Sequence, residues 1–408
     1  MTTTINNEHK KLNVPNLRFK EFQGEWEEHL LGNISDVTKL AGFEFTKYVT
    51  YEDTGSIIAI RGLNCKNGSL DLRDVKYIDN SDFSKLSRSK LYVGDILYTY
   101  VGTVGEVAVV DKNDKYYLAP NVSRIRLSKD YNSDFIKQLL GSKKFYNKIV
   151  FPLIATSSQP ALSMENLRKF KLRVPSIKEQ KKIASLFNAI DERIATQNKI
   201  IEDLKKLKSA IIDYTIDSLD ADFVKFGSLY ETAGEGGTPT TSNVQFYDNG
   251  NIPFIKIDDL KQKYLTENKD FITELGLQKS SAWLVPTRSI LFSNGATIGE
   301  ITITTYPVCT KQGILGIVPK QNIDVEFLYY FMSSSYFKKA ISRIVTEGTM
   351  KTAYLKDINN ILCPIPTKEK QQDIAIIPSA LNSKIDFEQS ILKLFITQKQ
   401  HLLRQMFI

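Results

Sequence analysis

The sequence predicts an α+β protein in which two β-rich domains alternate with two long helices that pair as an antiparallel coiled coil. Two observations predict it: an apolar seam with the coiled-coil period occurs twice, and the strand-like segments before each seam recur in the same order. We expect the first domain at residues 1–175, the first helix at 176–218, the second domain at 219–366 and the second helix at 367–408.

The first seam runs from Ile183 to Thr215 in alternating steps of four and three residues, which is the a/d spacing of a coiled coil. The same walk, about 190 residues later, runs from Ile374 to Met406. A single seam is also typical of a helix that packs on its own domain. Two copies favour pairing of the helices, and the polar seam residues of the expected helix pair are Gln197, Lys208, Glu388 and Lys399.

Two antiparallel alignments keep seam against seam. In one, Lys208 faces Glu388 and Gln197 faces Lys399; in the other, one heptad away, Lys208 faces Leu381 and the apolar overlap is larger. We expect the first alignment, because a mispaired buried charge is penalised more than a matched pair gains.

A proline and a hydroxyl residue precede both helices, at Pro175-Ser176 and again about 190 residues later. Ser176 and Glu179 have the spacing of a capping box, in which each side chain bonds the backbone N–H of the other residue. At the other end of the first domain, residues 1–22 predict an arm with little order.

Strand-like segments recur before each seam. Residues 91–110 have the β-branched and aromatic content and the glycine punctuation of a strand, a turn and a strand, and residues 290–300 repeat part of this pattern. A polar loop follows in each copy, at 155–160 and 348–352. The copies differ in their loops, since the Gly-Gly-Thr-Pro turn at 236–239 has no counterpart in the first domain. We expect the two domains to bind different things.

Composition limits the class of protein. The 408 residues are 42% hydrophobic, and no run reaches the roughly 18 uncharged apolar residues of a membrane span. We therefore expect a cytoplasmic protein without a membrane partner. The formal charge of +8 favours a polyanionic partner such as nucleic acid. Three cysteines and three histidines, scattered along the chain, predict neither a disulfide framework nor a metal site.

Catalytic motifs are absent from the sequence. There is no GxxxxGK[ST] phosphate loop, and no Asp/Asn-Pro-Pro-Tyr/Phe motif that would hold a flipped base. Binding chemistry remains, because the loops carry residue types that read base edges and phosphates, although any solvated loop contains them too. The candidate DNA-binding residues are Arg61, Tyr98, Tyr100, Thr103, Asn121, Thr156, Ser158, Gln159, Lys256, Asn294, Thr297, Gln312, Thr349 and Lys351.

The segments VPSIKEQKKIASLFNAIDERI, IPTKEKQQDIAIIPSALNSKI and GGTPTTSNVQFYDNGNIPFIKIDDL, in this order of domains and helices, resemble the specificity subunit of type I restriction-modification enzymes. The likeness covers nearly the whole chain. The motif at the helix start is matched at Pro175 and Gln180 and at Pro366 and Gln371. Pro378 departs from the pattern, because a proline inside a helix removes a hydrogen-bond donor.

The resemblance implies that each domain is a target-recognition domain that reads one half of a bipartite, asymmetric double-stranded DNA target. It implies that the helices act as a spacer and as the docking site of methyltransferase (modification) subunits, with two such subunits and two restriction subunits per complex. S-adenosylmethionine, ATP and magnesium would then belong to these partners, and this chain would bind no cofactor and catalyse no reaction.

Two hypotheses of other classes stand beside this one. A tandem-repeat adaptor would bind proteins only, and its indifference to DNA would distinguish it. A self-contained nuclease or methyltransferase would show activity as a single chain. The bases recognised and the spacer length do not follow from the sequence, because they depend on loop geometry and DNA shape.

Overall fold

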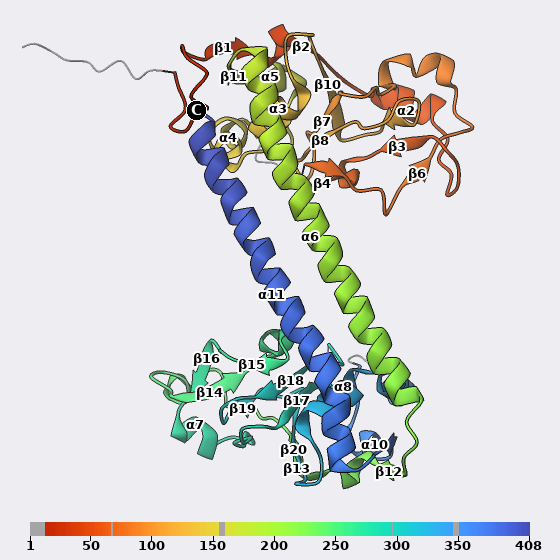
Figure 1. Cartoon of the computed structure of the whole chain (residues 1–408), viewed down its shortest axis with the longest axis vertical. Coiled ribbons are helices and arrows are strands. Elements are labelled where there is room, and N and C mark those ends of the chain that lie inside the picture. The colour runs from red at the N-terminus through yellow and green to blue at the C-terminus, as the bar shows by residue number, and fades with distance from the viewer. Residues whose placement is uncertain (1–12, 67, 155–159, 296, 346–350) are drawn as a thin grey trace, which may run out of the picture. The chain divides into compact units, whose positions relative to one another are not determined.

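The computed structural model describes residues 13–66, 68–154, 160–295, 297–345 and 351–408 (Figure 1). The chain forms two compact units. Unit 1 combines residues 1–197 with 391–408, and unit 2 comprises residues 198–390. Each unit contains one β-rich domain and part of both long helices, α6 (Ile177–Asp217) and α11 (Lys368–Met406). The predicted fold class, with β-rich domains and long helices alternating along the chain, is confirmed.

The domain of unit 1 is built on a four-stranded antiparallel sheet with the strand order β2-β10-β7-β8. A three-stranded sheet, β6-β3-β9, and the pairs β1-β11 and β4-β5 complete it. The strands are β1 (Glu27–Leu30), β2 (Ser35–Lys39), β3 (Ile58–Ile60), β4 (Cys65–Lys66), β5 (Ser69–Leu70), β6 (Lys76–Tyr77), β7 (Ile96–Thr99), β8 (Val107–Val109), β9 (Tyr116–Leu118), β10 (Val122–Leu127) and β11 (Lys171–Val174). The helices are α1 (Leu31–Ile34), α2 (Gly42–Tyr48), α3 (Ser133–Leu140), α4 (Lys143–Phe145) and α5 (Met164–Arg168).

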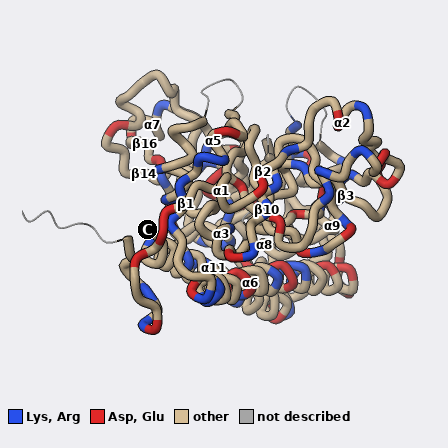
Figure 2. Tube along the Cα trace, turned by 90° about the horizontal axis from the view of Figure 1, so that it is seen from above, with Lys and Arg blue, Asp and Glu red and all other residues tan. Residues whose placement is uncertain are grey.

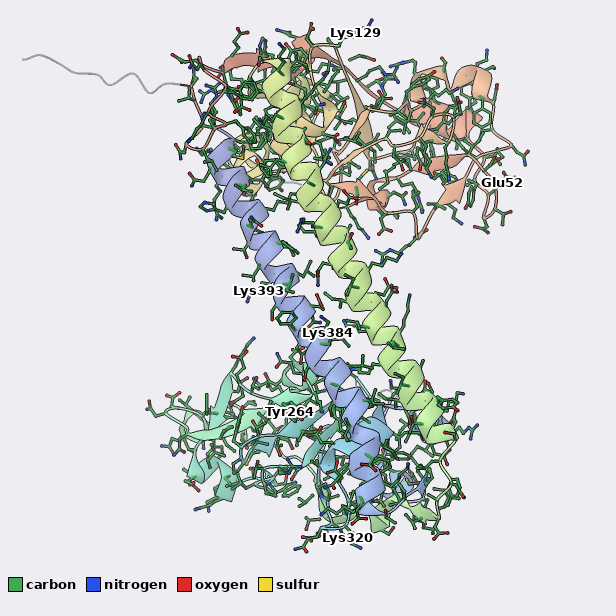
Figure 3. The ribbon with its side chains drawn as sticks, viewed as in Figure 1. Glu52, Lys129, Tyr264, Lys320, Lys384 and Lys393 are labelled. Atoms are coloured by element: carbon green, nitrogen blue, oxygen red, sulfur yellow. The ribbon has the colours of Figure 1, made fainter. Side chains whose placement is uncertain are left out.

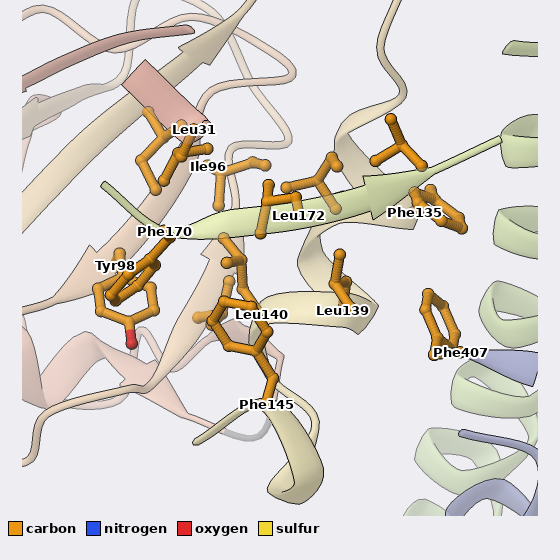
Figure 4. Close-up of a cluster of buried hydrophobic side chains, with 14 of the residues drawn as sticks. Leu31, Ile96, Tyr98, Phe135, Leu139, Leu140, Phe145, Phe170, Leu172 and Phe407 are labelled. Atoms are coloured by element: carbon orange, nitrogen blue, oxygen red, sulfur yellow. The ribbon is translucent and has the colours of Figure 1, made fainter. Parts of the chain in front are cut away.

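The main core of unit 1 joins the domain to the long helices (Figure 4). The ring of Phe135 on α3 lies 5.7 Å from that of Trp26 and 5.1 Å from that of Phe407, measured between centroids. Phe187 on α6 lies 5.7 Å from Phe407. Because burial of a large apolar side chain contributes roughly 1.5–3 kcal/mol, this aromatic group holds α6 and the end of α11 on the first domain.

The domain of unit 2 repeats this plan with a five-stranded sheet, β13-β20-β17-β18-β15, a three-stranded sheet, β16-β14-β19, and the pair β12-β21. Its strands are β12 (Phe223–Lys225), β13 (Tyr230–Glu235), β14 (Ile252–Ile255), β15 (Tyr264–Leu265), β16 (Asp270–Ile272), β17 (Ile290–Ser293), β18 (Ile301–Thr304), β19 (Cys309–Thr310), β20 (Ile314–Pro319) and β21 (Leu362–Pro364). Its helices are α7 (Glu274–Gln278), α8 (Val325–Ser333), α9 (Ser335–Ile344) and α10 (Leu355–Ile358). The core again includes long-helix residues, among them Ile212, Ile216 and Ala375.

A buried glutamine fixes the start of each long helix, and sequence reasoning missed this role. Gln180 accepts a hydrogen bond from the N–H of Asn132, the N-cap of α3, at 2.9 Å and donates to the carbonyl of Pro175 at 2.8 Å. In unit 2, Gln371 accepts from the N–H of Asp324 at 2.8 Å and donates to the carbonyl of the proline before α11 at 2.9 Å. Both glutamines are 1% exposed. The repeated helix-start motif therefore attaches each helix to its own domain.

The expected capping box at Ser176 is only half present. The N–H of Glu179 lies 3.5 Å from the Ser176 hydroxyl, but the Glu179 carboxylate accepts two hydrogen bonds from Arg18 instead. Residues 13–22 are also better ordered than the sequence predicted, since Leu17 donates its N–H to the carbonyl of Gln405 at 2.9 Å. The composition of this segment gave no sign of these contacts, which join residues far apart in the chain.

The pairing of the long helices differs from the predicted alignment. In unit 1, Lys399 Nζ lies 2.5 Å from Oδ1 of Asp191. In unit 2, Lys208 Nζ donates to Oδ1 of Asn382 at 3.0 Å. Both pairs belong to the alignment with the larger apolar overlap, and they run the two helices antiparallel within each unit.

The predicted opposition of Lys208 to Glu388 and of Gln197 to Lys399 is therefore wrong. Asn382 is the neighbour of Leu381, and Glu388 lies six residues further along α11, about 9 Å at the helical rise. A lysine at a seam position can bury its methylene stem and turn its ammonium to a polar residue beside the seam. Polar matching inside the seam is then unnecessary, and the apolar overlap decides the register. Pro378 lies within α11, which continues past it.

Among the helices of the described chain, none has the length together with the apolar character that a membrane crossing requires. In the same described ranges, no three His, Cys, Asp or Glu residues gather as a set that could hold a metal ion.

Candidate nucleic-acid interface

The turn between β7 and β8 is held by a buried hydroxyl. Thr99 Oγ1 accepts the N–H of Glu106 at 2.9 Å and donates to the carbonyl of Thr103, across the turn. Gly105 within this turn has φ +100°, a conformation that favours glycine. Thr99 is 1% exposed, so the hydrogen bonds that support this turn are shielded from solvent.

The turn between β17 and β18 is built in the same way. Ser293 Oγ accepts the N–H of Glu300 at 2.8 Å and donates to the carbonyl of Thr297. Gly299 has φ +109°, and Ser293 is 0% exposed. The two domains therefore present the same kind of hairpin turn on the same hydroxyl bridge.

A second segment lies against each hairpin turn. In unit 1, the N–H of Leu162 donates to the carbonyl of Tyr100 at 2.8 Å, and that of Gly102 donates to the carbonyl of Pro160 at 2.9 Å. In unit 2, the N–H of Ala353 donates to the carbonyl of Asn294 at 2.9 Å. The flanks of the predicted loops are thus brought beside the hairpin in both domains. Four candidate residues, Thr156, Ser158, Gln159 and Thr349, lie outside the described residues.

Most of the described candidate residues lie at the surface. The exposed ones are Thr103, Asn121, Lys256, Thr297, Gln312 and Lys351, and Arg61 and Tyr100 are half-buried. Arg61 Nη2 lies 2.8 Å from Oδ1 of Asp74, and Lys256 Nζ lies 2.7 Å from Oδ1 of Asp270. A contact of either cation with phosphate would compete with these ion pairs, which are weak where they are exposed.

Two candidates are corrected, because their side chains are buried. Tyr98 is 0% exposed; its ring packs 6.0 Å from that of Phe170, and burial raises the pKa of its hydroxyl. Asn294 is 2% exposed, and its amide donates to the carbonyl of Ala353 at 3.3 Å. All residues of β7 are buried, so a hydroxyl at the end of a side chain in this strand does not indicate a surface position. Tyr98 and Asn294 therefore pack inside their domains, beneath the candidate interface.

Lys39 is a candidate interface residue that sequence reasoning missed. Its exposed ammonium lies 5.2 Å from the centre of the Tyr100 ring, an arrangement that favours a cation over the aromatic face. Burial raises the pKa of the Tyr100 hydroxyl. The pairing of β10 with both β2 and β7 brings these residues together, and no local signal in the sequence predicts that order.

Basic residues do not form a single stretch along the chain. Lys/Arg and Asp/Glu residues alternate along α6 and α11, and both kinds occur on the loops of the domains (Figure 2). The positive charge near the hairpins therefore comes from a few separate residues, among them Lys39 and Arg61 in unit 1 and Lys338 and Lys351 in unit 2.

Comparison with known proteins points to one family. The family model for the type I restriction modification DNA specificity domain matches residues 23–206 and 219–394. The HindI specificity subunit of Haemophilus influenzae is 22% identical, over 89% of this chain and 95% of its own length. The MjaIX specificity subunit of Methanocaldococcus jannaschii is 33% identical over 41% of this chain and 39% of its own length.

A solved structure has the same fold. The S subunit of the type I restriction-modification system from M. genitalium superposes with a TM-score of 0.59 at 16% identity, over 97% of this chain and 99% of that one. At this sequence identity the likeness shows a shared fold and no more.

Proposed function

Because the chain belongs to the type I restriction-modification specificity subunits, we propose that it binds double-stranded DNA, with each β-rich domain reading one half of a bipartite target. One observation carries this proposal: both domains hold a hairpin turn and a second segment together by matching hydrogen bonds, yet the side chains on these frames differ. The half-buried Tyr100 of the first domain corresponds to the buried Asn294 of the second, and Arg61 corresponds to Lys256. Different side chains on the same frame favour two unrelated half-sites.

The chemistry is proposed to reside in partner subunits. We assign methyl transfer with S-adenosylmethionine to two methyltransferase subunits, and cleavage with ATP and magnesium to two restriction subunits, all in the cytoplasm. This chain would supply recognition and assembly without a catalytic step and without a cofactor of its own.

An exposed apolar row supports docking on the helices. Ile200, Leu207 and Tyr214 recur every seven residues on α6 within unit 2, and 40%, 49% and 77% of their surfaces are exposed. Exposed apolar side chains in a row are typical of a protein contact. We assign this row to a methyltransferase subunit.

Methylome sequencing of a host with and without this gene tests the proposal. The expected result is a methylated motif with two unrelated halves separated by a fixed number of unspecified bases. A palindromic motif would contradict the asymmetry, and a methylome that does not depend on the gene would contradict the function. Purified chain retained by DNA without a partner would exclude the adaptor hypothesis.

Substitutions then assign the half-sites. In the complex with methyltransferase subunits, Tyr100→Ala should weaken or relax reading of one half only, and Thr297→Ala should affect the other half. Loss of a base contact costs roughly 1–3 kcal/mol. Lys129→Ala is the matched control, because this exposed lysine follows the far end of β10 from Asn121 (Figure 3). Equal effects of Tyr100→Ala on both halves would contradict the assignment.

A further inference from the structure

We propose that unit 2 contains a pocket for a nucleobase with its phosphate, beside the hairpin turn of β17 and β18. The pocket itself is argued from the geometry of this chain, and DNA as the source of the base rests on the function proposed above.

The pocket has a volume of about 340 Å³ and lies between the hairpin, α8 and α9. Its apolar wall includes Phe292 and Phe337, which are 1% and 0% exposed, and Ile341, which is 6% exposed. Two exposed lysines, Lys338 and Lys351, complete the lining. The volume falls at the lower end of the roughly 300–1,000 Å³ that small-molecule sites occupy.

The corresponding position of the first domain indicates which shape of ligand the pocket of unit 2 accepts. Ser142 and Ser334 are matching N-caps: each accepts the N–H of a phenylalanine three residues on, at 3.2 Å. The residue after this phenylalanine is Tyr146 in unit 1 and Lys338 in unit 2. The Tyr146 ring lies so close to Gly105 that a Cβ added there would meet it at 2.7 Å.

The matching glycine of unit 2 faces open space. Among the described residues, no atom lies within 4 Å of a Cβ added at Gly299, although its φ is close to that of Gly105. An aromatic ring of the chain thus fills in unit 1 the position that is open in unit 2. We infer that the open position accepts a flat ring supplied by a ligand.

The charges around the pocket select the ligand. Among the described lining residues there is no carboxylate, and in the described part of the chain neither Lys338 nor Lys351 has an ion-pair partner. Two ammonium groups beside an apolar wall suit a ring that carries an anion, and lysine is a phosphate-binding side chain. The apolar wall suits the flat ring and the two ammonium groups suit its phosphate, so a nucleotide matches both parts of the site.

The position of the pocket favours DNA as the source. Thr297 and Gly299 belong to the turn that is proposed to face the second half-site, so an unstacked base of bound DNA could enter beside it. Unstacking costs a few kcal/mol, an amount that the ring contacts and the two lysines together can offset.

Lys338→Tyr is the test variant, because it grafts the ring of the first domain into the second. Lys339→Tyr is the matched control: Lys339 is the exposed neighbour on α9 and does not line this pocket. Unchanged thermal midpoints of both variants verify folding. The probes are dAMP and target DNA that carries 2-aminopurine at successive positions other than the methylated base. Binding of dAMP to the full chain is measured by saturation-transfer NMR, and 2-aminopurine is measured by its fluorescence in the complex with methyltransferase subunits.

We expect dAMP signals to fall several-fold in Lys338→Tyr and to persist in Lys339→Tyr. We expect the same pattern for 2-aminopurine fluorescence at one position of the second half-site. A response of dAMP alone would identify a free nucleotide as the ligand. If DNA binding is normal and neither probe responds to Lys338→Tyr, the pocket is overturned and the proposed function stands. If the chain does not bind DNA but the dAMP response is as expected, only the proposed function is overturned.

Discussion

The guanidinium of Arg18 holds the carboxylate of Glu179 in a two-pronged contact, with Nε and Nη2 at 2.8 and 2.7 Å from the two oxygens. Glu179 is at the start of α6 and only 1% exposed, so Arg18→Ala should leave a buried carboxylate without its cation. We expect a loss of about 3 kcal/mol in the free energy of unfolding of unit 1, as for other broken buried pairs. Chemical denaturation measures it. Arg18→Lys should recover only part of the loss, because an ammonium lacks the planar fork; equal stability of wild type and Arg18→Ala would refute this role.

The hydroxyl bridge under each hairpin should control one half-site. Thr99→Val keeps the shape of the side chain but leaves the N–H of Glu106 and the carbonyl of Thr103 without this partner. An unsatisfied buried polar group costs about 1–3 kcal/mol of folding free energy. We expect weaker discrimination at the half-site of the first domain only, measured by competition with DNA altered in either half.

The natural control for that experiment is the other copy. Thr99→Ser retains the hydroxyl that Ser293 uses in unit 2 and should behave as wild type. Ser293→Ala should impair the second half-site. A Thr99→Val protein that reads both halves normally would remove the bridge from the recognition mechanism.

Lys208 should destabilise unit 2 at neutral pH. Burial lowers the pKa of its ammonium, so the unfolded chain binds the proton more tightly than the folded chain. The cost is fully present below the folded pKa and disappears as pH rises toward the ordinary value of 10.5. Lys208→Met should raise stability by about 1 kcal/mol at pH 7, with a smaller gain near pH 10.5, in thermal unfolding.

Asn382→Leu is the opposing control, because it removes the partner of Lys208 and should lower stability at pH 7. If Lys208→Met were less stable than wild type at pH 7, the bond to Asn382 would outweigh the cost of burying the charge.

The three cysteines should report unfolding. Burial raises the pKa of Cys65 and Cys363 to about 12 and that of Cys309 to about 11. At pH 8 the thiolate fraction of Cys65 should be about 1,000-fold below that of the unfolded chain, and labelling by a disulfide reagent correspondingly slow. Since these pKa values are raised, their contribution to stability is present below about pH 9 and is lost as pH rises from 9 to 12. Rapid labelling of the folded chain would contradict the burial.

The long helices are predicted to set the distance between the half-sites. With 41 residues, α6 is about 60 Å long. Seven residues inserted after Ile194 in α6, and seven after Phe395 in α11, keep the a/d phase and add about 10 Å. The methylated motif should keep both halves and gain about three unspecified base pairs at roughly 3.4 Å each. Insertion in α6 alone is the control, since it shifts the pairing; an unchanged spacer in the double insertion would refute the role.

The sequence predicted the elements whose side chains repeat with a period. The seam residues Ile183 and Phe187 enter the core of unit 1, and the seam residue Ile374 packs against that of unit 2, because an apolar face of a helix must be covered. Near the end of α6 the buried residue is Ile212, one position after the predicted Ile211. Register was not predictable in the same way. The register depended on whether Lys208 needed a polar partner within the seam. Its long side chain instead reaches Asn382, which lies beside the seam.

Contacts between distant segments were the main omission. Arg18 with Glu179 and Lys39 with Tyr100 each join segments through a packing order that no local pattern encodes. Tyr98 was misjudged for the converse reason, since its strand is covered on both faces while the sequence offers a polar hydroxyl. The hairpin turns were therefore predictable from the sequence, whereas the side chains that support them were not.

Phe407, in the core of unit 1, has a consequence for biosynthesis. Unit 2 is contiguous and has all of its residues once residue 390 has left the ribosome, whereas unit 1 also needs residues 391–408. Until Phe407 has been synthesised, the rings of Trp26, Phe135 and Phe187 lack the contacts that they make with it in the folded unit. Domains usually fold in the order of synthesis. We therefore expect the domain that is made first to complete its core last, so that its nascent form is the species exposed to chaperones and proteases.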